Sequence, residues 1–312
     1  MIKAVNLKKY YGDVKAVDNI DFEISKGDIT GFLGPNGAGK TTTMKLLTGY
    51  LPPDNGEIEI KGINVRENPK KIKEQIGYLP EIAPLCPDML TFNYLSFIAR
   101  MRGIKGKEIK KRIERVVGIC NIEKVIGRPI SELSKGYTRR IGLAQAMIHD
   151  PEVLILDEPT SGLDPIQIIE IRNLIKDLGK EKTVILSTHI LPEVQATCNK
   201  VLIINNGKLV ADGTLEELQK LKGEIIINIK IKAPGLKKEE IMNIFEKVEN
   251  IIKIHSDNDE SEEIMGFKVH TRTNIDLREE IFSFIKDKGW ILLEMNREIY
   301  SLEEIFKNLT VN

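Results

Sequence analysis

The run GPNGAGKTT, from Gly34 to Thr42, has residue types and spacing that suit the binding of phosphate groups. It matches the pattern G-x-x-x-x-G-K-[ST], in which glycines let successive backbone N–H groups turn toward phosphate oxygens. Lys40 would reach the outer phosphates, and the hydroxyl of Thr41 would hold Mg²⁺. An ordinary glycine turn is the alternative, but an apolar run before and a helical pattern after the motif favour the phosphate site. The predicted site comprises Gly34, Pro35, Asn36, Gly37, Ala38, Gly39, Lys40, Thr41 and Thr42.

Two adjacent carboxylates follow the apolar run VLIL and supply a second chemical group. Asp157 would hold Mg²⁺ directly or through water, and Glu158 would polarise the water that attacks the γ-phosphate. The alternative is a pair of solvated acids ahead of the next helix. Together with the phosphate motif, the pair favours phosphate-ester hydrolysis.

His189 ends the next apolar run, VILSTH. The carboxyl ends of parallel strands meet at one edge of a sheet, where open α/β sheets bind their ligands. A lone histidine is usually a surface or packing residue, but this position favours a catalytic role beside Glu158.

The elements that must position these residues are those of an α/β protein. Residues 1–80 alternate short β-rich runs with glycine turns, interrupted by one expected helix from about residue 40 to 48. Residues 91–149 carry apolar residues three and four apart, which predicts a helical insert. Apolar strands then alternate with helices, which indicates a parallel sheet covered on both faces.

A change of composition after Gly223 predicts a second domain. Its order of expected elements, β-α-β-β-α-β followed by a helix, is that of a ferredoxin-like α+β unit. Ser301 and Glu304 have the spacing of a capping box at the last helix. We therefore expect domains at residues 1–222 and 223–312.

The composition limits the partners. The chain has 46 basic and 46 acidic residues, a balance that argues against nucleic acid as the main partner. It has no apolar run near the roughly 18 residues that span a bilayer. Cys86, Cys120 and Cys198 lack the paired spacing of a metal site or disulfide framework, so we expect all three to be packing residues.

Four motifs in this order, GPNGAGKTT, LSKGY, LILDEPTSGLDP and STH, resemble those of the ATP-binding subunit of an ABC transporter. The resemblance covers residues 1 to about 220. It implies a P-loop NTPase core with a helical subdomain at about 91–149, and ATP and Mg²⁺ as cofactors. It also implies a head-to-tail dimer with itself or a homologous ATPase subunit, in which each ATP contacts one subunit's P-loop and the other's signature sequence.

The resemblance also implies roles for individual residues. Tyr11 matches the aromatic that stacks on adenine, with Val17 packing nearby, although the adjacent Tyr10 is a second candidate. Asp164 matches the loop that meets the opposite subunit. The signature that would act on the partner's ATP consists of Ser134, Lys135, Gly136 and Tyr137.

Two positions depart from the family's common pattern. Glu81 replaces a glutamine that contacts the metal or the attacking water, so a second carboxylate would stand beside the triphosphate. Lys135 and Tyr137 replace a glycine and a glutamine of the signature. Lys135 would either grip a γ-phosphate or lie in solvent.

The ferredoxin-like unit and the closing run SLEEIFKNL resemble the ABC-2-type exporter branch. This implies an integral membrane permease as partner and a position at the cytoplasmic face of the cell membrane. The loop after Glu81, with Ile82, Leu85, Met89 and Leu90, is the expected docking segment or an ordinary packed loop. Two other classes remain: a soluble ABC ATPase without a transport role, and an ATPase whose C-terminal domain senses a ligand. The single P-loop and the short helical insert disfavour the first.

Overall fold

The computed structural model describes residues 1–220, 224–245, 248–257, 264–272, 276–298 and 306–307. The chain divides into two compact units, Met1–Leu215 and Glu216–Asn312, each of which is described by itself. The sequence placed the division seven residues later, at 222/223, beyond the short helix α8 (Leu215–Lys220). That domain boundary stays a prediction.

A six-stranded sheet forms the centre of the first unit, in the order β10-β9-β3-β8-β7-β6. Neighbours from β9 to β6 run parallel, and β10 joins β9 in antiparallel orientation. Every residue of β7 and β8 is buried, which explains their continuous apolar runs. The strands are β3 (Ile29–Leu33), β6 (Ile76–Leu79), β7 (Val153–Asp157), β8 (Thr183–Thr188), β9 (Lys200–Asn205) and β10 (Lys208–Thr214).

A second, antiparallel sheet of order β2-β1-β4-β5 packs with the central sheet around one hydrophobic core. Apolar residues of β1, β2 and β4 alternate with exposed ones, as expected for strands with one buried face. The strands are β1 (Ile2–Tyr11), β2 (Val14–Ile24), β4 (Asn55–Ile60) and β5 (Ile63–Asn64).

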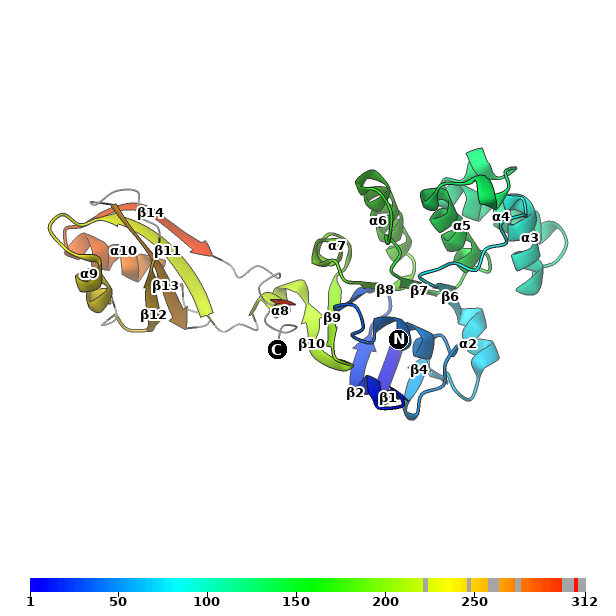
Figure 1. The fold of residues 1–312 in the computed structure, drawn as a ribbon, viewed down its shortest axis with the longest axis horizontal. Helices are drawn as coiled ribbons and strands as arrows, with labels where there is room; N and C mark the ends of the chain where they lie inside the picture. The colour runs from blue at the N-terminus through cyan, green and yellow to red at the C-terminus, as the bar shows by residue number, and fades with distance from the viewer. Residues whose placement is uncertain (221–223, 246–247, 258–263, 273–275, 299–305, 308–312) are drawn as a thin grey trace. The chain divides into compact units, whose positions relative to one another are not determined.

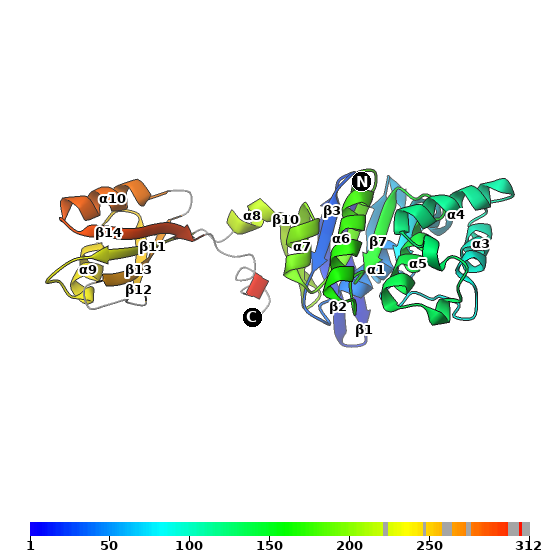
Figure 2. The same ribbon diagram turned by 90° about the horizontal axis from the view of Figure 1, so that it is seen from above.

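The helices of this unit fall into two groups. The first group lies with the strands and comprises α1 (Lys40–Leu47), α2 (Pro69–Gln75), α6 (Pro165–Gly179) and α7 (Leu191–Thr197). The second comprises α3 (Thr91–Met101), α4 (Lys107–Cys120) and α5 (Lys135–Met147), which pack on one another. They gather at one end of the unit, beyond β6 and β7, in both Figure 1 and Figure 2. The predicted helical insert is therefore present.

The second unit contains a four-stranded antiparallel sheet in the order β12-β13-β11-β14. With two helices between the strands, this order is that of a ferredoxin-like unit, as predicted. The elements are β11 (Glu224–Lys232), α9 (Lys238–Phe245), β12 (Ile251–Ser256), β13 (Ile264–Arg272), α10 (Arg278–Asp287) and β14 (Ile291–Glu298). The expected last helix lies mostly outside the described residues, as does its capping pair, Ser301 and Glu304.

Two sequence expectations were wrong. The region 1–80 contains a second helix, α2, which begins at Pro69 and buries only Ile72, so its charged sequence shows no helical apolar pattern. Cys86 is exposed on the loop before α3, whereas Cys120 and Cys198 are buried as expected. Burial raises the pKa of each buried thiol to about 12.

Candidate active site

The loop between β3 and α1 is the predicted phosphate cradle, and two close approaches require its glycines. A Cβ on Gly34 would lie 2.4 Å from the carbonyl oxygen of Ile204, and one on Gly39 would lie 2.2 Å from that of Ala16. Gly39 also has φ +112°, and Gly37 has φ +80°. Only glycine adopts these conformations readily, so the loop can turn its N–H groups inward before α1 begins at Lys40.

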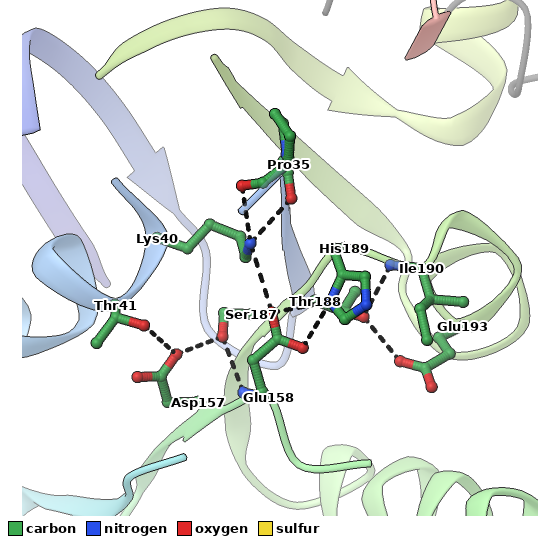
Figure 3. A network of polar contacts seen from close by, with 11 residues as sticks. Pro35, Lys40, Thr41, Asp157, Glu158, Ser187, Thr188, His189, Ile190 and Glu193 are labelled. Carbon is green, nitrogen blue, oxygen red and sulfur yellow. Dashed lines mark hydrogen bonds and ion pairs between the residues drawn. The ribbon is translucent and has the colours of Figure 1, made fainter. Parts of the chain in front are cut away.

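Lys40 is buried and lies against the loop that carries it. Its Nζ donates to the carbonyl oxygens of Gly34 at 2.9 Å and Pro35 at 3.1 Å. The same ammonium lies 3.4 Å from Oε1 of Glu158 (Figure 3). The lysine is therefore held at the mouth of the cradle by two carbonyls and one carboxylate.

Glu158 turns toward Lys40 because its backbone leaves β7 in a left-handed conformation, with φ +47°. In extended backbone, neighbouring side chains point to opposite sides, and this turn removes that restriction. The N–H of Glu158 donates to Oγ of Ser187 on the adjacent strand β8 at 2.9 Å. Nδ1 of His189 lies 3.0 and 3.2 Å from the two carboxylate oxygens of Glu158. The structure thus brings Lys40, Glu158 and His189 together.

Asp157 lies buried at the end of β7 and offers a free oxygen. Its Oδ1 accepts from the hydroxyls of Ser187 at 2.5 Å and Thr41 at 3.3 Å. Its buried Oδ2 has no hydrogen-bond partner. Burial raises the pKa of this carboxyl, and the bonds from Ser187 and Thr41 oppose that rise.

These oxygens fit a hard cation such as Mg²⁺, which takes carboxylate and hydroxyl oxygens and keeps several waters. Within the described residues, no group of three or more His, Cys, Asp or Glu side chains is arranged to hold a metal. Glu81, which lines the same cavity as Thr41, together with water and phosphate oxygens would supply the remaining ligands.

An open cavity of about 710 Å³ joins Lys40, Thr41, Glu158 and His189, whereas the buried Asp157 does not line it. The predicted residues that line it are Asn36, Gly37, Gly39, Lys40, Thr41, Thr42, Glu81, Glu158 and His189. Gly34 and Pro35 act from behind the loop through their carbonyls, and Ala38 is buried. Further lining residues were not predicted: Asp13, Val14, Lys15, Ala16, Ser161 and Asn206.

The three residues considered for an adenine site lie in different settings. Tyr10 donates its hydroxyl to Asp18 at 2.8 Å. Tyr11 is 50% exposed, which leaves its ring accessible, but it does not line the cavity. Val17 is completely buried in the hydrophobic core, so Val14 to Ala16 rather than Val17 face the cavity. Stacking of Tyr11 on adenine stays a prediction.

The signature residues lie at the start of α5, outside that cavity. Ser134 caps the helix, and its Oγ accepts from the N–H of Tyr137 at 3.5 Å. Ser134, Gly136, Tyr137 and Asp164 line a separate open cavity of about 840 Å³. A Cβ on Gly136 would lie 2.8 Å from the side chain of Gln167, so a glycine lets α5 approach α6.

Lys135 and Asp164 make local contacts within the chain. Asp164 caps α6 by accepting from the N–H of Gln167 at 2.9 Å. The exposed Lys135 reaches Gly162, where an added Cβ would lie 3.1 Å from its Nζ. Lys135 therefore extends along its own SGLD loop.

Two residues that contact the site residues were not predicted from the sequence. Ser187 joins Asp157 to Glu158, and the available signal is a hydroxyl residue that directly follows the apolar run VIL of β8. Arg139 extends from α5 to the loop of Glu81, where its Nη1 donates to the carbonyls of Pro80 at 3.2 Å and Glu81 at 2.9 Å. Nothing in the local pattern distinguishes Arg139 from its neighbour Arg140.

Comparisons with known proteins give the family. Residues 17–161 match the family model described as "ABC transporter". The chain is 40% identical over 222 residues to the bacitracin transport ATP-binding protein BcrA of Bacillus licheniformis, covering 70% of this chain and 72% of that protein. It is 34% identical to the Nod factor export ATP-binding protein I of Ralstonia nicotianae, covering 70% and 68%.

One relative spans both units. The chain is 33% identical over 307 residues to the uncharacterized ABC transporter ATP-binding protein YhaQ of Bacillus subtilis, covering 98% of this chain and 97% of that protein. Among solved structures, CbiO1 of Clostridium perfringens, part of an ABC transporter complex, superposes with a TM-score of 0.65 at 31% identity. That match covers 71% of this chain and 91% of CbiO1.

Proposed function

Because this chain belongs to the family of ABC transporter ATP-binding proteins, we propose that it is the ATPase subunit of an ABC-2-type membrane exporter and works as a head-to-tail dimer. Its membership of an ATPase family and its P-loop site make it an ATP-hydrolysing enzyme.

The dimer is supported by the separation of the phosphate loop from the signature within one chain. The cavity of the phosphate loop and the cavity of the signature share no lining residue. Ser134 and the start of α5 therefore lie outside the cavity in which their own chain would hold the phosphates of ATP. A helix N-terminus attracts anions, so the γ-phosphate of an ATP on a second subunit is the ligand that suits it.

The surface beside the signature supports a protein contact. Ile166 is 71% exposed and Ile169 is 53% exposed, both on α6 just after Asp164. Exposed apolar side chains next to a polar anion site are typical of an interface. A head-to-tail dimer would cover these residues while it brings Asp164 to the partner.

Hydrolysis would begin with an exchange of partners at Lys40. In the structure, Nζ of Lys40 lies 3.4 Å from Oε1 of Glu158, so the two side chains form an ion pair. A bound γ-phosphate would draw Lys40 toward itself and leave Glu158 to accept a proton from the attacking water, with His189 beside it. Asp157, Thr41 and Glu81 would hold Mg²⁺, which neutralises charge that develops on the phosphates.

The membrane partner is supported by an exposed apolar surface. None of the helices within the described residues has the length and apolar character of a membrane span. Ile82 on the loop after Glu81 is 84% exposed, and Met101 and Phe97 of α3 are 70% and 46% exposed. We propose that this loop and α3 dock on a permease at the cytoplasmic face of the membrane. Export as the direction rests on relatives such as the Nod factor export protein.

Co-purification tests the membrane partner. Tagged protein from detergent-solubilised membranes should retain a multi-span membrane protein, and Met101→Asp should release it while ATPase activity of the isolated subunit is kept. Ile252→Asp is the matched control, because Ile252 is 50% exposed on β12 of the second unit. If no multi-span protein is retained in repeated preparations, a soluble ABC ATPase becomes the better proposal.

A further inference from the structure

The loop of residues 80–90 lies between the ATP cavity and the helical group α3–α5. At its start, Glu81 lines the cavity. Further along, the carbonyls of Pro87 and Met89 accept from the backbone N–H groups of Ser131 and Ile130, which precede α5. The loop is thus attached to the helical group along its length, and Arg139 makes the attachment nearest the cavity.

Arg139 is only 9% exposed, although it carries a charge. Burial lowers the pKa of its guanidinium, and the nearby carboxylates of Glu81, Asp157 and Glu158 oppose that fall. These are three acids of the ATP site. The site therefore has three carboxylates, and the P-loop lysine can balance the charge of only one. Arg139 contributes a second positive charge.

Arg139 also binds two consecutive carbonyls with one nitrogen, at 3.2 Å to Pro80 and 2.9 Å to Glu81. Hydrogen bonds from a charged donor are among the stronger ones in proteins. The backbone on either side of the Pro80–Glu81 peptide is consequently fixed to α5. These bonds fix the backbone position from which the Glu81 side chain starts.

We propose that Arg139 is a positioning residue for ATP hydrolysis, which holds the Glu81 carboxylate at the metal end of the cavity and offsets its charge. This rests on the proposed role of Glu81 at the metal or the attacking water. Ser134 caps the same helix, α5. Arg139 therefore also connects the Glu81 loop of its own ATP site to the signature that would bind the ATP of a second subunit.

The test uses Arg139→Gln and Arg139→Lys, with Arg102→Gln as control. Arg102 also donates from its Nη1 to a backbone carbonyl, that of Lys73 at 2.6 Å, but it lines neither the ATP cavity nor the signature cavity. Arg139→Gln should lower kcat at least about tenfold and change KM for ATP less than about threefold. Arg139→Lys keeps the charge and should recover part of kcat. Arg102→Gln should lower the melting temperature without this effect on kcat.

A double-mutant cycle separates positioning from general destabilisation. In a Glu81→Ala background, the contacts of Arg139 to the carbonyls remain, but no carboxylate is left to position. Arg139→Gln should then cause no further loss of kcat. If the Arg139→Gln protein is unfolded, the same cycle is run with Arg139→Lys.

The outcomes distinguish the role of Glu81 in hydrolysis from the role of Arg139 in positioning it. If Glu81→Ala leaves kcat unchanged, the proposed role of Glu81 is wrong. If Glu81→Ala lowers kcat and the loss from the Arg139 substitution adds to it in full, Glu81 has its role but Arg139 does not position it. An equal loss of kcat in Arg102→Gln would also overturn the proposal.

Discussion

Ser187→Ala removes one hydroxyl that connects the two carboxylate residues of the site. In the folded protein this hydroxyl donates to Oδ1 of Asp157 at 2.5 Å and accepts from the N–H of Glu158 at 2.9 Å. Ser187 is completely buried, as is Asp157. The substitution leaves Asp157 with only the longer bond from Thr41 and strands the N–H of Glu158.

The expected cost follows from these two losses. A hydrogen bond to a charged group contributes about 1.5–3 kcal/mol, and a stranded buried N–H costs about 1–3 kcal/mol. Because one side chain makes both bonds and the site relaxes, we expect a loss of about 3 kcal/mol in the free energy of unfolding. Losing the bond also raises the pKa of Asp157 further, so the loss should shrink as the pH falls and Asp157 becomes protonated in both proteins.

Urea unfolding of the parent and the variant measures this cost, read from midpoints at an unchanged slope. Ser96→Ala is the matched control. Ser96 is also a buried serine, but its Oγ has no hydrogen-bond partner. Its removal should change stability by less than about 0.5 kcal/mol. Equal losses in the two variants would refute the view that Ser187 acts through Asp157 and Glu158.

Two further predictions concern His149 and Glu158. Burial and the nearby Arg102 lower the pKa of His149 to about 4, while its Nε2 donates to the carbonyl of Ile76 at 2.9 Å. The unfolded state gains a proton near pH 6.5, so this residue's contribution is complete above about pH 6.5 and is lost toward pH 4, by up to about 3 kcal/mol. His149→Gln should flatten that part of the stability profile, and an unchanged slope in urea unfolding between these pH values would contradict it. Glu158→Gln should bind ATP normally and stop hydrolysis; a parental rate of phosphate release would exclude Glu158 as the base.

The sequence predicts the site best where function demands particular residues in consecutive positions. The phosphate loop, Asp157 and Glu158 are recognisable because a strand, a turn and a helix must follow one another to place them. The apolar runs VLIL of β7 and VIL of β8 predict buried parallel strands, because both faces of such a sheet are covered. In these segments the local pattern and the tertiary environment agree.

Other features depend on contacts between distant parts of the chain. Ser187 acquires its role only when β8 lies beside β7, and Arg139 only when α5 packs against the loop of Glu81. Helix α2 is stabilised by one buried residue, Ile72, and so carries no apolar period. Val17 faces the core because the alternation of β2 is set by its pairing with β1, which the local motif does not reveal.

Size-exclusion chromatography of the Glu158→Gln protein tests the central claim that Ser134 completes the ATP site of a second subunit. Without ATP it should elute as a monomer, and with ATP and Mg²⁺ as a dimer. Adding Ser134→Arg should abolish the ATP-dependent dimer but leave ATP binding by the monomer intact, because the two cavities of one chain are separate. The same ATP-dependent dimer with and without the arginine would contradict the account.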